Sequence, residues 1–508
     1  MNNILKTFVF VASTIGSFFL VVNDSHALPV FARQMGVACE VCHAGTYPLL
    51  TPFGRAFKAS GFTMTGAQEK VEGDKLSIPS VLNLGIFASA RWAKSNGQDP
   101  SIPPTNAVNV ASVNNGQVSI PDEITLFFGG RVGEHIGFLG EAHFTDTPNG
   151  VHGAILGGGK MPIGFDVGSG RLMVVPFTTS GNGVSYGFET LNTGANAIHT
   201  FMIDNASVYS AAQYLGTATD ASGLALVGVS NDLGFASFTK WSPNHLIGGS
   251  ASNGYAASPT SNYFRLALTP STLIANWDTD LGFQYWSGTS VIQATDTTPS
   301  PTNLAWESAG VSTVVYQQSQ GITSLPLNLN VNTRAWVVDA QLQGNVGANL
   351  LGFYASYGVA AASDCSSLAG VPNLFNPGCN EMKSFNIGVL YEAIPHLLFL
   401  DAGYRNARRS DPGTSTWYNT QLLGAPTGMP YSTLNDNAYA VGGFLKPTQN
   451  SKIELTYGWY RGSYYSPNGG PFCTANGGCS PFGYPMATAA NGGGSGNQLF
   501  EVEFSGDF

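Results

Sequence analysis

The sequence predicts a mainly β protein, an antiparallel barrel of about sixteen strands that spans an outer membrane, with a small helical domain at its N-terminus. Three observations support this. Charged residues make up only 10% of the 508 residues, whereas they make up about a quarter of an average soluble domain. Apolar and polar residues alternate from about residue 79 onward. Beyond the N-terminus, no stretch reaches the roughly 20 apolar residues of a membrane helix. Composition alone also allows a secreted, Gly-rich β protein.

Residues 1–27 have the pattern of a secretory signal peptide. Lys6 provides a positive start, 8–22 form an apolar core, and Ser25-His26-Ala27 supplies small residues at a cleavage position. The mature chain is therefore expected to leave the cytoplasm, so its cysteines meet an oxidising compartment.

Residues 28–77 are expected to form a small helical domain and a linker. In the stretch "TPFGRAFKASGF", Thr51 suits a helix N-cap, Pro52 suits the first helical position, and Gly61 suits the C-terminal cap. A polar, charged linker, "TGAQEKVEGDKLS", follows at 65–77.

Residues 78–508 are expected to form the barrel. Apolar and polar side chains alternate along 334–343, 351–357 and 451–460, as a wall between lipid and water requires. The last stretch, "LFEVEFSGDF", places Phe500, Val502, Phe504 and Phe508 on one face.

The connections between the expected strands alternate in length, as in barrels with short periplasmic turns and long outer loops. Short turns are predicted near 132–136, 231–232, 343–346, 393–396 and 447–450. Long loops are predicted near 93–120, 243–261, 288–330, 360–381, 408–436 and 463–497. The strands are hardest to assign within 146–220.

Four of the six cysteines lie in two of these loops. Cys365 and Cys379 are close in sequence, as are Cys473 and Cys479, and each pair lies in a segment rich in Gly, Pro and Asn. In an exported protein this spacing predicts two local disulfides, Cys365–Cys379 and Cys473–Cys479, that close surface loops.

The other two cysteines belong to the stretch "VACEVCHAG" at 37–45. A redox dithiol would need a βαβ context, and a zinc site would need a second ligand pair, and neither surrounds this stretch. C-x-x-C-H in an exported chain matches a c-type haem attachment site. Cys39 and Cys42 would form thioethers to the vinyl groups of one haem, and His43 would bind its iron.

Other residues could complete this haem site. Met64, beyond the expected helix, is a possible sixth iron ligand, and a His/Met pair would raise the reduction potential. Met35 is closer in sequence, and either Met could instead pack against the porphyrin edge. Arg55 or Lys58 could pair with a propionate, or could be solvated.

The segment "LPVFARQMGVACEVCHAGTYPLLTPFGRAFKASGFTMT" resembles the N-terminal cytochrome of the fused outer-membrane cytochrome–porins of iron-oxidising bacteria. The shared pattern comprises "FARQ", "CEVCH", a Pro-Leu pair, "FGRAFK" and "GFTMT", in this order. The close match covers about 40 residues of this segment. Beyond it, the resemblance is one of barrel architecture.

This resemblance implies an oxidoreductase that takes electrons from Fe(II) outside the cell. One covalent haem would pass them to a periplasmic c-type cytochrome or copper protein, with the haem domain on the periplasmic side or inside the barrel. Asp339, Asp401 and Glu454 are expected to face the lumen, as lumen-facing polar residues ordinarily do.

Three other functions remain open from the sequence. The chain could carry electrons from another donor or to another acceptor, or it could be a porin in which the haem domain gates or senses. It could also be a soluble secreted cytochrome, although the final strand argues against this. With a net charge of −10 and scattered Lys and Arg, a nucleic-acid partner is not expected.

Overall fold

A computed structural model of the full chain describes most of its length. The described residues are 29–47, 49–74, 76–95, 116–146, 152–194, 210–230, 232–245, 259–270, 274, 276–294, 327–364, 371–376, 378–410, 433–461 and 498–507. The predicted signal peptide, Cys365, the Cys473–Cys479 pair and Phe508 lie outside these residues. Cys379 is described, and it is disulfide-bonded.

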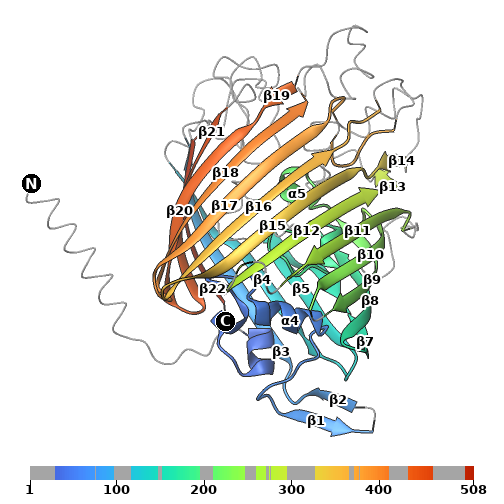
Figure 1. The fold of residues 1–508 in the computed structure, drawn as a ribbon, viewed down its shortest axis with the longest axis vertical. Coiled ribbons are helices and arrows are strands. Elements are labelled where there is room, and N and C mark those ends of the chain that lie inside the picture. Colours follow the sequence, from blue (N-terminus) through green and yellow to red (C-terminus); the bar gives the residue numbers. More distant parts are fainter. Residues whose placement is uncertain are drawn as a thin grey trace, which may run out of the picture.

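Three short helices and a hairpin precede the barrel (Figure 1). They are α2 (Pro29–Met35), α3 (Cys39–Cys42), α4 (Pro52–Ala59), β1 (Lys70–Gly73) and β2 (Leu76–Pro79). The predicted start of α4 is confirmed, because the Thr51 side chain accepts a hydrogen bond from the Gly54 N–H at 3.1 Å. Its end is confirmed by Gly61, which follows the helix with φ +70°.

Apart from one further hairpin, the remaining strands close into one antiparallel barrel. They are β3 (Asn83–Ser95), β4 (Gln117–Arg131), β5 (Gly137–Asp146), β6 (His152–Lys160), β7 (Ile163–Val167), β8 (Gly170–Thr179), β9 (Ala221–Ser230), β10 (Gly234–Ser242), β11 (Ser261–Leu268), β12 (Trp277–Ser287), β15 (Ala335–Val346), β16 (Asn349–Ala360), β17 (Met382–Ile394), β18 (Leu398–Ser410), β19 (Thr433–Asn435), β20 (Asn437–Thr448), β21 (Ser451–Arg461) and β22 (Gln498–Asp507). A separate hairpin joins β13 (Thr289–Ala294) to β14 (Leu327–Asn332).

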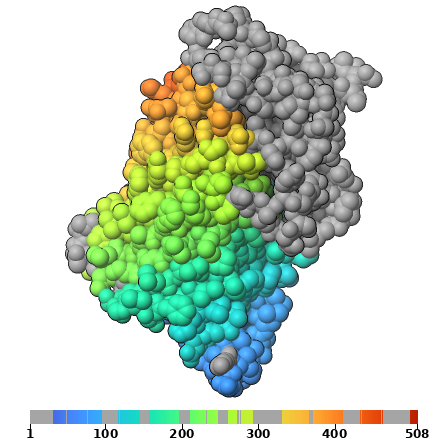
Figure 2. Space-filling model, turned by 90° about the vertical axis from the view of Figure 1, so that its right-hand side faces the viewer, coloured from blue at the N-terminus to red at the C-terminus, as the bar shows by residue number. Residues whose placement is uncertain are grey.

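Among the described residues, the barrel wall has sixteen strands when interrupted strands are counted once. Eighteen strands are in the ring, but β6 and β7 both pair with β8, and β19 and β20 both pair with β18, so each of these two pairs is one interrupted strand. The ring closes where β22 pairs with β3, with Glu503 opposite Arg91. The predicted barrel and its strand number are confirmed. Figure 2 shows consecutive strands of one wall as inclined bands in sequence order.

The wall has an apolar outer face and a polar inner face. On β21, Leu455 is 43% exposed and Tyr457 is 37% exposed, whereas Glu454 of the same strand faces inward and is fully buried. On β22, Phe504 is 54% exposed and Glu501 is 1% exposed. A closed sheet with this alternation leaves no unpaired edge and turns its apolar side chains outward, which is the pattern of a barrel that crosses a bilayer.

Short turns and long connections alternate, as predicted, along the described strands. The described turn residues 132–136, 232–233, 395–397 and 449–450 lie at the end of the barrel where the chain ends (Figure 1). One predicted turn was wrong in position. Strand β15 continues through 343–346, and the turn is made by 347–348, where Gly347 has φ +67°.

The segment 146–220 is the hardest to assign from sequence, and its described residues beyond β8, 180–194 and 210–220, fold into the lumen. It contains the 3-10 helix η2 (Val184–Tyr186) and the helix α5 (Ala211–Tyr214). Figure 1 shows α5 inside the ring of strands. An apolar cluster surrounds it and includes Trp241 and Trp286 from the wall, both fully buried. Among the described residues, no helix is long and apolar enough to cross a membrane.

Candidate cofactor site at the N-terminal helices

Helix α3 carries both cysteines of the C-x-x-C-H stretch. The backbone N–H of His43 donates to the Cys39 carbonyl at 2.9 Å, which ends the helix at the histidine. Both thiols are free and half-buried. The side chains of Cys39, Cys42 and His43 line one cavity, so the structure brings together the three residues that the sequence predicted.

One ring nitrogen of His43 is oriented by a hydrogen bond. Its Nδ1 lies 3.2 Å from the Leu49 carbonyl oxygen, so Nδ1–H donates there and Nε2 keeps a free lone pair. Part of the ring faces the cavity, but the surrounding protein excludes bulk water, and this burial lowers the pKa of His43 to about 4. A neutral imidazole with one oriented nitrogen is what a metal-binding histidine requires.

Both thiols are protonated in the folded chain. Burial, followed by the charge of Asp507, raises the pKa of Cys39 to about 11. Burial also raises the pKa of Cys42. Reactive cysteines and zinc ligands need an environment that favours the thiolate. Burial keeps both thiols protonated in the structure.

Helix α4 packs tightly against α3 at a glycine. A Cβ on Gly54 would lie 2.2 Å from the Cys42 carbonyl oxygen, so no larger residue fits without moving a helix. Thr51 joins the two segments twice, because its hydroxyl donates to the Val41 carbonyl at 2.6 Å and its N–H donates to the Cys42 carbonyl at 3.0 Å. These contacts fix the motif relative to the rest of the cavity.

The cavity has a volume of about 360 Å³, within the roughly 300–1,000 Å³ of ligand pockets. Most of its lining area is apolar, and the apolar lining residues include Phe31, Phe57, Phe62, Leu49 and Leu139. Charged side chains line it as well: Lys58, Glu141, Lys160, Glu189, Lys446, Lys452, Glu503 and Asp507. Phe31 stacks on Phe62 with ring centroids 4.8 Å apart. An apolar cavity next to two thiols and an oriented imidazole fits a flat, largely apolar macrocycle.

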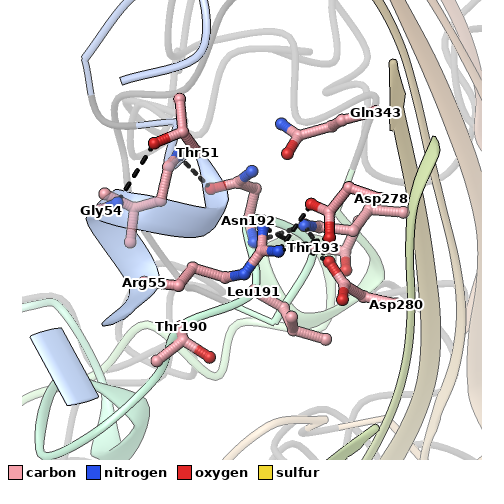
Figure 3. Close-up of polar contacts among 12 residues, drawn as sticks. Thr51, Gly54, Arg55, Thr190, Leu191, Asn192, Thr193, Asp278, Asp280 and Gln343 are labelled. Atoms are coloured by element: carbon pink, nitrogen blue, oxygen red, sulfur yellow. Dashed lines mark hydrogen bonds and ion pairs between the residues drawn. The ribbon is translucent and has the colours of Figure 1, made fainter. Parts of the chain in front are cut away.

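Helix α4 is tied to the barrel wall by a buried ion pair (Figure 3). The Arg55 guanidinium lies 2.6 Å from Asp278 and 3.5 Å from Asp280, both on the inner face of β12. In the same region, the Leu50 N–H donates to the Asn192 side chain at 2.9 Å, and the Asn192 N–H donates to the Gln341 side chain at 2.9 Å. The site is thus assembled by the helices, the lumen segment and the wall together.

Strands β4 and β20 also make hydrogen bonds to the N-terminal residues. The Gln34 amide nitrogen donates to the carbonyls of Phe62 and Met64, and its oxygen accepts from the Arg131 N–H on β4. The Lys446 ammonium on β20 donates to the Gly45 carbonyl at 2.8 Å. Contacts to β4, β12 and β20 place residues 29–65 inside one end of the barrel.

Other predicted residues of the site are placed differently. Met64 is half-buried and does not line the cavity, and neither does Met35. The role of Met64 as a sixth iron ligand stays a prediction. Arg55 forms an ion pair with Asp278 of the barrel wall, whereas Lys58 lines the cavity.

The three predicted lumen-facing acids do face inward, with at most 5% exposure. Asp339 is paired with Arg265 at 2.6 Å, and Glu454 is paired with Lys452. None of these acids lines the cavity. Within the described part of the chain, no group of three or more His, Cys, Asp or Glu side chains could hold a metal ion.

One polar cluster could not be predicted from the sequence. Glu189 from the lumen segment and Asp339 from β15 both contact the buried Arg265 of β11, at 2.8 and 2.6 Å, and Thr193 donates to Asp339. This cluster anchors the lumen segment that lines the cavity. Only the unusual Arg265 on the inward face of a strand could have indicated it.

No protein-family model matches this chain, and no curated protein matches it. Among solved structures, the chain is similar to OmpT with loop L8 deleted, an outer membrane protein of Vibrio cholerae (10% identity over 84% of this chain and 99% of that chain, TM-score 0.41). It is also similar to the outer membrane channel DcaP of Acinetobacter baumannii (9% identity over 84% and 97%, TM-score 0.43). A third is OprB of Pseudomonas putida (10% identity over 84% and 94%, TM-score 0.45).

Proposed function

We propose that this protein is an outer-membrane electron carrier that takes electrons from extracellular Fe(II) and passes them through one c-type haem to a periplasmic c-type cytochrome or copper protein. The observation that carries the proposal is the joint placement of Cys39, Cys42 and His43 on an apolar cavity inside one end of a closed barrel. The donor, Fe(II), comes from the family resemblance of the N-terminal segment.

When bound, the haem would supply a one-electron couple at its iron. Cys39 and Cys42 would hold the macrocycle by thioether bonds, each formed when an S–H adds across one vinyl group. His43 would bind the iron through Nε2, because its Nδ1 is oriented by the Leu49 carbonyl. The phenylalanines of the cavity would exclude water from the haem faces.

The barrel would serve as an insulating wall around this site. Its apolar outer face and closed pairing support a place in a bacterial outer membrane. The short turns and the chain end lie at the end that holds the N-terminal helices, and in such barrels this end is periplasmic. A periplasmic acceptor would therefore approach the end where Cys39 and Cys42 lie.

The direct test combines attachment with reduction. The purified protein in mild detergent is oxidised, mixed with Fe(II) without oxygen at acid pH, and followed by the absorption bands of reduced c-type haem. We expect the bands to grow, and we expect C39S/C42S to carry no covalent haem. C379S, which removes a cysteine from a loop disulfide, is the control and should retain the haem.

Two outcomes would favour another function. A haem that dithionite reduces and Fe(II) does not would indicate a conduit with a different donor. A protein that carries haem but conducts small solutes freely would favour a porin with a gating or sensing domain. Absence of covalent haem would overturn the proposed function.

A further inference from the structure

The chain folds back after the C-x-x-C-H stretch, so that Leu50 lies opposite His43 in an isolated antiparallel bridge. The neighbours of this pair make the hydrogen bonds that flank it, and one of them runs from the Ala44 N–H to the Leu49 carbonyl at 2.9 Å. In this kind of antiparallel pair the two opposite residues exchange no hydrogen bond with each other. The Leu50 N–H therefore points away from His43, and its acceptor comes from another part of the chain.

That acceptor is the side chain of Asn192, which lies 142 positions later in the lumen segment. The Leu50 N–H donates to its Oδ1 at 2.9 Å. Figure 3 shows Asn192 between helix α4 and the strands of the wall. Asn192 also lines the cavity that His43 lines. Its amide nitrogen is buried and has no hydrogen-bond partner within the described residues, so the oxygen is the atom of this side chain that holds Leu50.

The backbone at Asn192 is fixed to the barrel wall independently of its side chain. The Asn192 N–H donates to the Gln341 side chain at 2.9 Å, and the Thr193 hydroxyl donates to the Asp339 carboxylate at 2.6 Å. Gln341 and Asp339 both lie on β15. The Asn192 side chain therefore projects from a held backbone, and its removal beyond Cβ would leave these two anchors in place.

A single peptide group connects Asn192 to His43. The Leu50 N–H that Asn192 accepts and the Leu49 carbonyl that accepts from Nδ1 of His43, at 3.2 Å, belong to the same peptide bond. A trans peptide group is planar, so its N–H and its C=O point in opposite directions. The hydrogen bond from Asn192 on one side therefore fixes the direction of the carbonyl on the other side. Hydrogen bonds in such a chain also polarise one another.

We propose that Asn192 is a positioning residue for His43, which fixes the orientation of the imidazole through the Leu49–Leu50 peptide group and strengthens its donation to the haem iron. This inference rests on the proposed function. A hydrogen bond at the distal nitrogen of a metal-bound histidine raises the basicity of the ligand, and such bonds are one of the means by which a protein tunes a haem. The barrel thereby takes part in setting the reduction potential, because the anchors of Asn192 lie on β15.

The test uses full-length N192A in mild detergent, with three readouts. Exchange of the Leu50 amide hydrogen, followed by mass spectrometry, should speed up on the order of tenfold, because its acceptor is lost. The g values of the oxidised haem in the electron paramagnetic resonance spectrum should change, because they report the strength and orientation of the imidazole. At a fixed ambient potential, the ratio of reduced to oxidised haem should rise roughly threefold, since a weaker imidazole donor favours the reduced iron. Covalent haem should persist, because Cys39 and Cys42 are unchanged.

N182A is the matched control. Asn182 is also half-buried, belongs to the same lumen segment and lines the same cavity, but its amide donates to Glu141 at 3.0 Å. N182A should therefore keep the native exchange rate at Leu50 and the native g values. N192D keeps an oxygen acceptor for the Leu50 N–H and should restore both of these readouts, although its charge changes the ratio. If N192A does not accumulate, N192S replaces it, because a serine hydroxyl ends one bond short of Oδ1.

The proposal is overturned if N192A exchanges the Leu50 hydrogen faster and yet keeps the native g values and the native ratio. It is also overturned if N182A changes the g values as much as N192A does. Either result would leave the proposed function intact, because Fe(II) would still reduce the haem. A wild-type chain without covalent haem would overturn both.

Discussion

Single residues decide whether the motif can act as a cofactor site. The Leu49 carbonyl selects the tautomer of His43, and Gly54 lets α4 approach the carbonyl of Cys42. Both features lie outside the C-x-x-C-H pattern itself. They show how local backbone contacts turn a short sequence motif into an oriented set of side chains.

The lowered pKa of His43 predicts acid tolerance of the iron–imidazole bond. A histidine whose pKa is depressed to about 4 stays neutral as the pH falls through 6.5, where an exposed histidine would be protonated. Protonation would compete with the iron only near pH 4 or below. An absorption spectrum followed against pH should therefore show unchanged axial coordination from pH 7 to about 5.

A change between pH 7 and 6 in the absorption bands that report coordination of the iron by His43 would contradict this prediction. It would mean that the imidazole is hydrated in the loaded protein. Since the pKa is depressed on folding, protonation of the unfolded chain costs stability as the pH falls from about 6.5 toward 4.

Gly54→Ala should disturb the site through sterics alone. The added Cβ would meet the Cys42 carbonyl at 2.2 Å, so α3 and α4 must separate, at a cost of about 1–3 kcal/mol for an overpacked contact. We expect less covalent haem per protein and a lower denaturant midpoint. Gly133→Ala is the matched control, because a Cβ there meets nothing within 4 Å. Equal haem content in both variants would show that the close approach is not needed.

Among the elements, α4 has the clearest link to the wall. Its Arg55 joins Asp278 and Asp280 on β12. Phe57 and Lys58 of the same helix line the cavity. One short helix therefore lines the cofactor site and also anchors the N-terminal residues to the barrel.

Arg55→Met should loosen this anchor. It leaves Asp280, fully buried, without its cation, and breaking a buried pair costs on the order of 3–5 kcal/mol. The cost here should be smaller, because the Asp278 side chain is 21% exposed. We expect the absorption band of the haem to be lost at a lower denaturant concentration, with partial recovery in R55M/D280N, which removes the buried charge left without its partner.

The control for this change is Arg171→Met. Arg171 pairs with Asp166 near a turn, and the Asp166 side chain is 74% exposed, so its loss should cost less than about 1 kcal/mol. If R55M is no less stable than R171M, the ion pair does not hold the helix in place.

At the scale of the whole molecule, the lumen is filled at two levels. Residues 29–47 and 49–65 occupy one end, and the described part of 180–220 packs with its apolar cluster against the strand ends farthest from the short turns. A barrel of sixteen strands would otherwise leave an aqueous channel. We therefore expect this packing to restrict the passage of solutes through the barrel.

Conductance across a planar lipid bilayer tests this. We expect the purified full chain to give steps far smaller than those of an open porin with the same strand number, with or without dithionite. Stable steps of porin size would show that the packing of the lumen is not tight in the membrane.

The sequence by itself predicted a barrel of about sixteen strands, which is confirmed, and a haem site at the C-x-x-C-H stretch, which stays a prediction. Alternation with period two is local, since each strand must face lipid on one side, and Cys39, Cys42 and His43 are adjacent in the chain. It placed one turn wrongly, at 343–346, because polar residues at the end of β15 look like a turn. Only the tertiary structure decided that Met64 lies outside the cavity and that Arg55 binds the wall. It also decided that Lys160 and the Glu189–Arg265–Asp339 cluster join the site. These contacts link residues from about 70 to more than 200 positions apart. No local pattern carries such a pairing, because it depends on which strands the closure of the barrel brings opposite the N-terminal helices.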